Sequence, residues 1–382
     1  MTLPVLEHKI SNAKQLLTPA LLIFPEIVDG NIRSTLSAMN NNPDAWRPHV
    51  KTAKLAATIR RLTAAGVRNF KCSTTLELNT VCAAGADDVL LSHLMTGANA
   101  ARLKEIAQAS PCRISTLVEQ ASQIPAWGGS KVGLFIDLNP GMDRTGIAVD
   151  DVASVVALAR RIVAAGIAFR GLHFYDGHLA HLPFLQRVSK AQQGYDRLIA
   201  TINELVRNGV EVGEVITSGT PTFLAALSHP GFSGQTFLHR VSPGTVVYGD
   251  RRSAAQIPDK YGFRPAAVVL STVVSHPATH LVTCDGGSKS VSADAGVPTC
   301  EVLDRPNLKP QKPSEEHLPI EVTFGTSKPA IGELLYLLPN HICTTINNFD
   351  RAWWIENDAA QRSEPVTARG RETMACDHTD HT

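Results

Sequence analysis

Short runs of β-type residues recur between residues 45 and 244, and a helical stretch follows almost every one of them. Such alternation is typical of βα units whose strands form a parallel sheet. The helical stretches carry apolar residues at i, i+3 and i+4 spacing, and several end at a glycine. The predicted strands are Ala45–Lys51, Arg68–Cys72, Asp88–Ser92, Arg113–Val118, Lys131–Asn139, Phe169–Tyr175, Glu214–Gly219 and Thr236–Pro243.

Eight strands within about 200 residues favour a closed (β/α)8 barrel over an open sheet. Beyond residue 250 the chain is rich in Val, Thr and Leu between Gly and Pro turns, which predicts a separate β domain. We therefore expect a barrel over residues 18–250, and a mainly β domain that consists of residues 251–370 together with the N-terminal segment 1–17. A disordered tail is expected over residues 371–382.

The charge balance excludes one broad class of function. The chain has 36 Lys and Arg against 35 Asp and Glu, a net charge of +1, so it has no strong field to attract nucleic acid or an anionic membrane. Its seven cysteines form an odd set without a CxxC pair, which is typical of reduced thiols in the cytoplasm. No signal-peptide pattern or long apolar run is present. We expect a cytoplasmic enzyme with a small-molecule substrate and no nucleic-acid or membrane partner.

In a (β/α)8 barrel the active site lies at the carboxyl ends of the strands. Lys51 ends the first predicted strand, and a lysine in a desolvated barrel mouth is a typical Schiff-base nucleophile. We expect Lys54 and Lys71 to be ordinary surface lysines. The other strand-end positions are Ser73, His93, Asn139, Tyr175–His178, Ser218–Thr220 and Pro243–Thr245.

Two loops after the last predicted strands are rich in small and hydroxyl-bearing residues. They are Thr217–Pro221 and Ser242–Thr245. Barrels commonly bind phosphate at this position through backbone N–H groups and a short helix. A lysine that faces such loops is the arrangement that pyridoxal 5′-phosphate (PLP) requires.

The pair His341-x-Cys343 is a candidate metal site. On a strand, residues i and i+2 project to the same face, so this imidazole and this thiolate could share one divalent cation. Zinc matches nitrogen and sulfur ligands, with manganese or magnesium as alternatives. An interior cysteine beside a turn histidine is the other interpretation.

Several motifs occur in order along residues 18–370. They include Arg47-Pro-His-Val-Lys51-Thr-x-Lys54, Phe70-Lys-Cys-Ser-Thr-Thr-x-Glu77, Gly141-Met-Asp-Arg-Thr-Gly146, Gly171-Leu-His-Phe-Tyr-Asp-Gly177, Ser314-Glu-Glu-His317 and Pro339-Asn-His-Ile-Cys343. Together the motifs resemble those of the D-threonine aldolase/D-serine dehydratase family. Its members are fold-type III PLP enzymes with an alanine-racemase-like barrel, so the resemblance implies that the barrel over residues 18–250 binds PLP.

The resemblance implies a role for each candidate residue. Lys51 would bear PLP as a Schiff base, and Arg144 and Tyr175 would lie near the pyridoxal ring. His341 and Cys343 would bind a divalent metal beside the cofactor. The residues implied around the phosphate are Ser218, Gly219, Thr220, Gly244 and Thr245.

The same resemblance implies a lyase that acts on D-3-hydroxy amino acids. His-x-Cys is similar to the pattern of the dehydratases, which form a 2-oxo acid and ammonia, whereas aldolases carry His-x-Asp. The alternative is retro-aldol cleavage to glycine and an aldehyde, with His178 as the base at the hydroxyl. A racemase and a non-catalytic PLP-binding protein are further alternatives. Arg47 and His93 are candidate partners of the substrate carboxylate, and we expect a homodimer.

Overall fold

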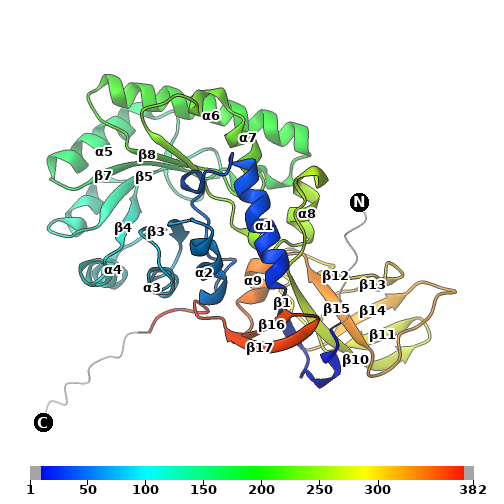
Figure 1. Cartoon of the computed structure of the whole chain (residues 1–382). Helices are drawn as coiled ribbons and strands as arrows, with labels where there is room; N and C mark the ends of the chain where they lie inside the picture. Colours follow the sequence, from blue (N-terminus) through cyan, green and yellow to red (C-terminus); the bar gives the residue numbers. More distant parts are fainter. Residues whose placement is uncertain (1–9, 374–382) are drawn as a thin grey trace, which may run out of the picture.

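Parallel strands between residues 69 and 241 curve into the predicted barrel in the computed structural model of this chain, which describes residues 10–373 (Figure 1). The strand order is β2-β3-β4-β5-β7-β8-β9, with a short β6 beside β5. The strands are β2 Asn69–Cys72, β3 Asp88–Leu94, β4 Arg113–Val118, β5 Gly133–Asn139, β6 Ile147–Ala148, β7 Phe169–Phe174, β8 Glu214–Thr217 and β9 Leu238–Val241. The predicted fold class is confirmed.

The first predicted strand, Ala45–Lys51, is not a regular strand. Trp46 forms an isolated parallel bridge to Val241 of β9, and His49 forms another to Lys71 of β2. Pro48 has no N–H to donate, which prevents a continuous ladder. The extended segment still lies between β9 and β2, so Lys51 leaves it at the barrel mouth.

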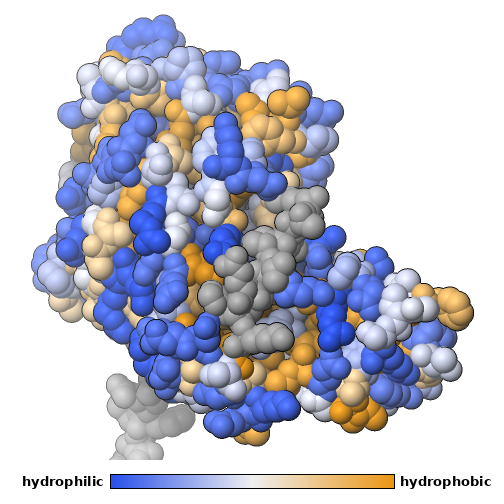
Figure 2. Space-filling model, turned by 45° about the vertical axis from the view of Figure 1, so that its right-hand side comes forward, coloured by the Kyte–Doolittle hydropathy of each residue, from blue (hydrophilic) through white to orange (hydrophobic). Residues whose placement is uncertain are grey.

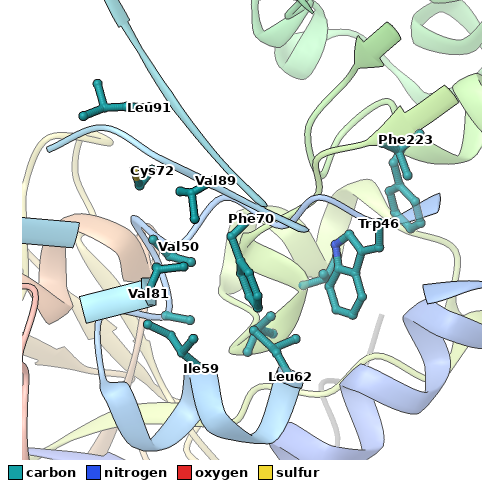
Figure 3. Packing of buried hydrophobic residues seen from close by; sticks show 14 of the residues in the cluster. Trp46, Val50, Ile59, Leu62, Phe70, Cys72, Val81, Val89, Leu91 and Phe223 are labelled. Carbon is teal, nitrogen blue, oxygen red and sulfur yellow. The ribbon is translucent and has the colours of Figure 1, made fainter. Parts of the chain in front are cut away.

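Helices cover the outside of the barrel (Figure 1). Phe70 and Cys72 of β2 pack with Val89 and Leu91 of β3 against the inner faces of the first helices (Figure 3). The α-helices of the barrel are α2 Ala56–Ala64, α3 Thr75–Ala83, α4 Gly97–Ala109, α5 Val152–Ala164, α6 Phe184–Arg207, α7 Phe223–Leu227 and α8 Arg251–Gln256. The short 3-10 helices of the chain are η1 Ala13–Gln15, η2 Pro43–Ala45, η3 Ala121–Trp127, η4 Gly177–His181, η5 Pro230–Phe232, η6 Thr245–Val247 and η7 Asp259–Tyr261.

A layer of charged side chains lies at the amino ends of the barrel strands. The Arg47 guanidinium is fully buried and donates to both oxygens of Glu214, at 2.8 and 2.9 Å, and to Asp88 Oδ1 at 3.1 Å. Arg170 and Arg240 complete the network around the same two carboxylates. Farther along the strands an apolar layer follows, made by Leu90, Leu117, Phe135 and Ile216. The barrel is therefore filled beneath its mouth.

We expect Arg47→Met to destabilise the protein by about 3 kcal/mol or more, because it leaves two buried carboxylates short of their main partner. Burial alone would raise the pKa of Asp88, but Arg47 and Arg170 lower it to about 2. The contribution of Asp88 is therefore present above about pH 4 and is lost as the pH falls toward 2. Urea unfolding at pH 7 measures the effect. Arg113→Met is the control, because the exposed Arg113 contacts Asp88 at 3.5 Å and should change stability by less than about 1 kcal/mol.

A nine-stranded, mainly antiparallel sheet forms the second body (Figure 1). Its main path runs β13-β14-β11-β10-β1-β16-β17, and β15 joins β10 to β12. The strands are β1 Ala20–Ile23, β10 Ala267–Ala278, β11 Leu281–Cys284, β12 Cys300–Val302, β13 Leu308–Pro310, β14 Leu318–Val322, β15 Leu334–Pro339, β16 Arg351–Glu356 and β17 Ala359–Pro365. Helix α9, Ile342–Ile346, follows β15 and lies between the sheet and the barrel (Figure 1).

The start of the chain contributes to this second sheet. β1 pairs with β10 and β16, and α1, Pro25–Ala38, leads from it toward the barrel. The boundaries 18–250 and 251–370 remain predictions, and most of segment 1–17 and of tail 371–382 lies outside the described residues. Among residues 10–373 no helix is long and apolar enough to cross a membrane.

The surface of the molecule is mixed in character. Figure 2 shows hydrophilic residues over most of the face in view, with apolar residues in scattered groups.

Candidate functional site

A cavity of about 250 Å³ opens at the carboxyl ends of the barrel strands, and we call it the hydroxyl cavity. It unites residues that are far apart in sequence, because α9 brings its first turn over the barrel mouth. Lys51 lines it together with both of the predicted phosphate loops and the predicted metal pair. The predicted site residues in its wall are Lys51, Tyr175, Gly219, Thr220, Gly244, Thr245, His341 and Cys343.

The ring of Tyr175 forms part of the cavity wall beyond the end of β7. Two glycines make room for it, since a Cβ on Gly177 would lie 2.5 Å from the ring and one on Gly219 would lie 2.8 Å from it. Any larger residue at either position would displace the tyrosine. The ring is therefore held by backbone on both sides and offers a flat surface at the mouth.

The two predicted phosphate loops carry buried hydroxyl groups that have no partner. Ser218, Thr220 and Ser242 are at most 6% exposed, and none of their side-chain oxygens makes a hydrogen bond within the described residues. Ser218 also adopts a left-handed backbone conformation with a φ of 61°, which is costly for a non-glycine residue. Buried donors are normally satisfied, so these hydroxyls require a polar ligand. They fit the phosphate of PLP.

Gly244 lets the second loop closely approach the extended segment that leads to Lys51. A Cβ at this position would collide with the carbonyl oxygen of His49, so only glycine allows the contact. Gly244 is also the residue before η6, and Gly244 and Thr245 both line the hydroxyl cavity.

Three cations surround the Tyr175 ring. The Nζ atoms of Lys51 and Lys71 lie 5.9 and 5.5 Å from the ring centroid, and Cζ of Arg144 lies 5.1 Å from it. Within residues 10–373, none of these cations has a carboxylate within ion-pair distance. The mouth therefore favours an anionic, planar ligand over the tyrosine.

The expectation that Lys54 and Lys71 are surface lysines is wrong. Lys54 is 5% exposed and pairs with Glu77 at 2.9 Å, whereas Lys71 is 3% exposed and donates to His173 Nε2 at 3.2 Å. The opposite ring nitrogen, Nδ1 of His173, lies 2.7 Å from Asp137 Oδ1. Burial, together with the nearby charges of Lys51 and Arg144, lowers the pKa of Lys71 to about 7.

A second cavity of about 330 Å³ adjoins the first, and we call it the basic cavity. Both cavities share His49, Lys51, Lys71 and Tyr175. His49 is held by Ser73 Oγ at 3.0 Å, and burial beside Lys51 and Lys71 keeps its pKa well below the usual value. The basic residues in the wall of this cavity are His49, Lys51, Lys71, His93, Arg144 and His173.

His341 and Cys343 are close together, although not for the predicted reason. They do not lie on a strand, because β15 ends at Pro339 and His341 is the extended residue directly before α9. The helical turn then brings the Cys343 thiol beside the imidazole. Contact with Cys343 and with Asp294 raises the pKa of His341 to about 9. Burial opposes ionisation of Cys343, but His341 and the charge of Lys51 lower its pKa overall.

This pair suits a divalent metal with open positions. Imidazole nitrogen and thiolate sulfur are the ligands that zinc prefers. Nδ1 of His341 lies 2.6 Å from Asp294 Oδ2, the carboxylate contact that typically orients a metal-binding histidine. No third His, Cys, Asp or Glu joins the pair among residues 10–373, so water or substrate would fill the other positions.

Three other predicted residues lie elsewhere. His178 lines a separate cavity with Phe174 and Lys190, and it is absent from the wall of the hydroxyl cavity that Lys51 lines. Arg47 is committed to the buried network at the bottom of the barrel, which rules out contact with a substrate carboxylate. His93 is exposed and lines the basic cavity.

Sequence reasoning missed Lys71, His49 and Ser242 as members of the site. Ser242 belongs to the second predicted phosphate loop, and its position next to the strand end is the available signal. His49 sits two residues before Lys51, and both residues line the two cavities. Only the position of β2 between its neighbours reveals that Lys71 faces the barrel mouth.

Comparison with known families gives two matches that cover most of the chain. Residues 27–252 match the family model described as "Alanine racemase, N-terminal domain". Residues 266–355 match a model of a serine dehydratase domain. The first match spans the barrel and the second spans most of the nine-stranded sheet.

Characterised relatives include both aldolases and dehydratases. D-threonine aldolase from Arthrobacter sp. is 27% identical over 92% of this chain and 93% of its own length. D-threo-3-hydroxyaspartate dehydratase from Delftia sp. strain HT23 is 24% identical over 86% of this chain and 91% of its own. The crystal structure of D-threonine aldolase from Filomicrobium marinum superimposes with a TM-score of 0.85 and is 27% identical, covering 94% of this chain and 97% of that one.

Proposed function

The chain belongs to the family of the alanine racemase N-terminal domain, within its group of PLP-dependent aldolases and dehydratases, and we propose that it is a metal-dependent dehydratase of D-3-hydroxy amino acids. One observation carries this proposal. Lys51 and the His341–Cys343 pair line a single cavity in one chain, beside hydroxyls that lack partners.

Each residue of the site takes a definite part in the proposed arrangement. Lys51 carries the cofactor, the Ser218–Thr220 and Ser242–Thr245 loops bind its phosphate, and Tyr175 supports its ring beside Arg144. PLP supplies an electron sink that stabilises negative charge at the substrate Cα. When the substrate amine replaces Lys51 on the cofactor, Lys51 Nζ becomes free to accept the Cα proton. This role requires the lysine amine to lie in the cavity wall, where the structure places it.

A metal at the His341–Cys343 pair would assist elimination. A divalent metal on His341 and Cys343 would act as a Lewis acid on the β-hydroxyl and help it leave. Loss of the Cα proton and of hydroxide removes one molecule of water and leaves an enamine. The enamine isomerises to an imine, and hydrolysis of the imine by water yields the 2-oxo acid and ammonia. Zinc is the metal we propose, because one sulfur and one nitrogen are its preferred donors.

Retro-aldol cleavage is the second candidate, since two of the relatives named above are aldolases. That reaction needs a base at the β-hydroxyl. His178, the residue expected for it, lies in a different cavity from Lys51, which favours elimination. A homodimer in the cytoplasm remains part of the proposal on grounds of sequence alone.

A product assay tests the proposed reaction. D-Serine, D-threonine and D-threo-3-hydroxyaspartate are each incubated with the PLP-loaded protein, with and without a chelator and with added zinc. We expect 2-oxo acid and ammonia in equal amounts, loss of both with the chelator, and recovery with zinc. Glycine and an aldehyde would establish the aldolase instead. Conversion between D and L forms without cleavage would establish a racemase, and absence of any turnover a non-catalytic protein.

A further inference from the structure

The basic cavity is lined by six basic residues, His49, Lys51, Lys71, His93, Arg144 and His173, and no carboxylate among residues 10–373 lines it. Burial lowers the pKa of His49 and His173, and His93 and Arg144 are exposed, so Lys71, at 3% exposure, is the cation that is removed from water most fully. A charged group taken out of water requires a counter-charge. Asp137 supports this region through His173, but it does not reach the cavity. We therefore expect the cavity to bind an anion.

The proposed cofactor would supply negative charge to only some of these basic residues. Its phosphate would lie with the hydroxyls of the other cavity, and its covalent link would occupy Lys51. Arg144, whose Cζ lies 5.1 Å from the Tyr175 centroid, is exposed and would flank the cofactor ring. Lys71, 5.5 Å from the same centroid, is left without an anionic partner.

Lys71 is fixed in place as a donor. Its Nζ donates one hydrogen bond to His173 Nε2. This nitrogen can accept the bond because the Nδ1–H of His173 donates to Asp137 Oδ1. Asp137 is fixed in turn by Thr145, whose hydroxyl donates to its Oδ2 at 2.7 Å. The remaining N–H groups of Lys71 are free to point into the two cavities that its side chain lines.

From this arrangement we propose that Lys71 binds the α-carboxylate of the amino-acid substrate. The inference rests on the proposed function. Lys71 and Lys51 both line the two cavities, so a substrate whose amine reacts at Lys51 carries its α-carboxylate close to Lys71. The metal pair lines only the hydroxyl cavity, so the β-hydroxyl would lie on the other side of Cα. His173 and Asp137 are positioning residues for Lys71.

One other cation could compete for this role. Arg252 lines the hydroxyl cavity, is exposed, and has no carboxylate partner among residues 10–373. It lies at the start of α8, however, and does not line the basic cavity. Because it is exposed to water, its charge needs no ligand. Arg252→Met is therefore the matched control for Lys71→Met.

Binding of two unreactive ligands tests the proposal. 3-Hydroxybutyrate carries the carboxylate and hydroxyl of the substrate at the same spacing, and 3-hydroxybutanamide is its uncharged counterpart. Neither has an amine that could displace Lys51. Calorimetric titration of the PLP-loaded protein should show tighter binding of the acid by about tenfold or more, the usual effect of a hydrogen bond to a charged group. Lys71→Met should lose this preference, whereas Lys71→Arg and Arg252→Met should keep it.

Several outcomes would overturn the assignment. Preference for the acid that survives in Lys71→Met, or that disappears in Arg252→Met instead, places the carboxylate elsewhere. In steady-state assays Lys71→Met should raise KM far more than it lowers kcat, and a fall in kcat alone would indicate proton transfer or a structural role. Circular dichroism and cofactor absorbance show whether each variant folds and loads. Wild-type turnover, measured on the same preparations, tests the proposed function separately.

Discussion

Lys51→Ala should abolish turnover, with a loss of about 10³-fold or more, because one substitution removes both the covalent attachment of the cofactor and the base at Cα. The absorbance of the protein-bound cofactor in the visible range should disappear with it. Other residues at the mouth, such as Tyr175 and the two hydroxyl loops, should still bind free PLP weakly.

Lys51→Arg is the informative companion variant. It keeps a cation above the Tyr175 ring, where Lys51 Nζ lies 5.9 Å from the centroid, but cannot form the covalent link. We expect it to fold and to be as inactive as Lys51→Ala. Lys312→Ala, a change of an exposed lysine in the β domain, should leave turnover and absorbance unchanged. Substantial turnover in either Lys51 variant would refute the assigned role.

The second large effect concerns the metal pair. Cys343→Ala and His341→Ala should each lose bound zinc, measured by elemental analysis of the purified protein. Activity should fall by more than the roughly 10- to 100-fold that loss of an outer partner costs. Asp294→Asn, which affects only the carboxylate that orients His341, should fall within that range. The result is a graded series in which metal content and turnover decrease together.

Cys82→Ser is the control for this series, because Cys82 is a half-buried thiol on α3, away from the hydroxyl cavity. It should keep both zinc and activity. Full activity of Cys343→Ala without bound metal would remove the Lewis acid from the proposed reaction. In that case racemisation, which does not need the pair, would become the better explanation of the site.

The barrel and its mouth could be predicted because the signals are local. Alternation of short strands and helices defines the fold, and a lysine at a strand end needs no knowledge of its neighbours to be placed at the mouth. The hydroxyl loops follow the same logic, since their position after the last strands puts them opposite Lys51. Gly219 and Gly244 were identified in this way.

Features that depend on packing between elements could not be predicted. In β2 the polar Asn69 and Lys71 alternate with the apolar Phe70 and Cys72, a pattern that is typical of a strand with one face in water, yet all four residues are buried. This pattern predicts that Lys71 lies on the surface. The sequence likewise predicts a strand at His341 and Cys343, because five residues are too few for α9 to show a helical pattern. Pro48 alone hints that the first strand is irregular.

Identification of the lysine that carries the cofactor tests the central claim most directly. Borohydride reduction of the PLP-loaded protein fixes the cofactor to its lysine, and peptide mass spectrometry then locates the added mass. We predict the label on Lys51, with Lys71 unmodified although it lies over the same tyrosine ring. Label on Lys71, or on no lysine of the barrel mouth, would contradict the account.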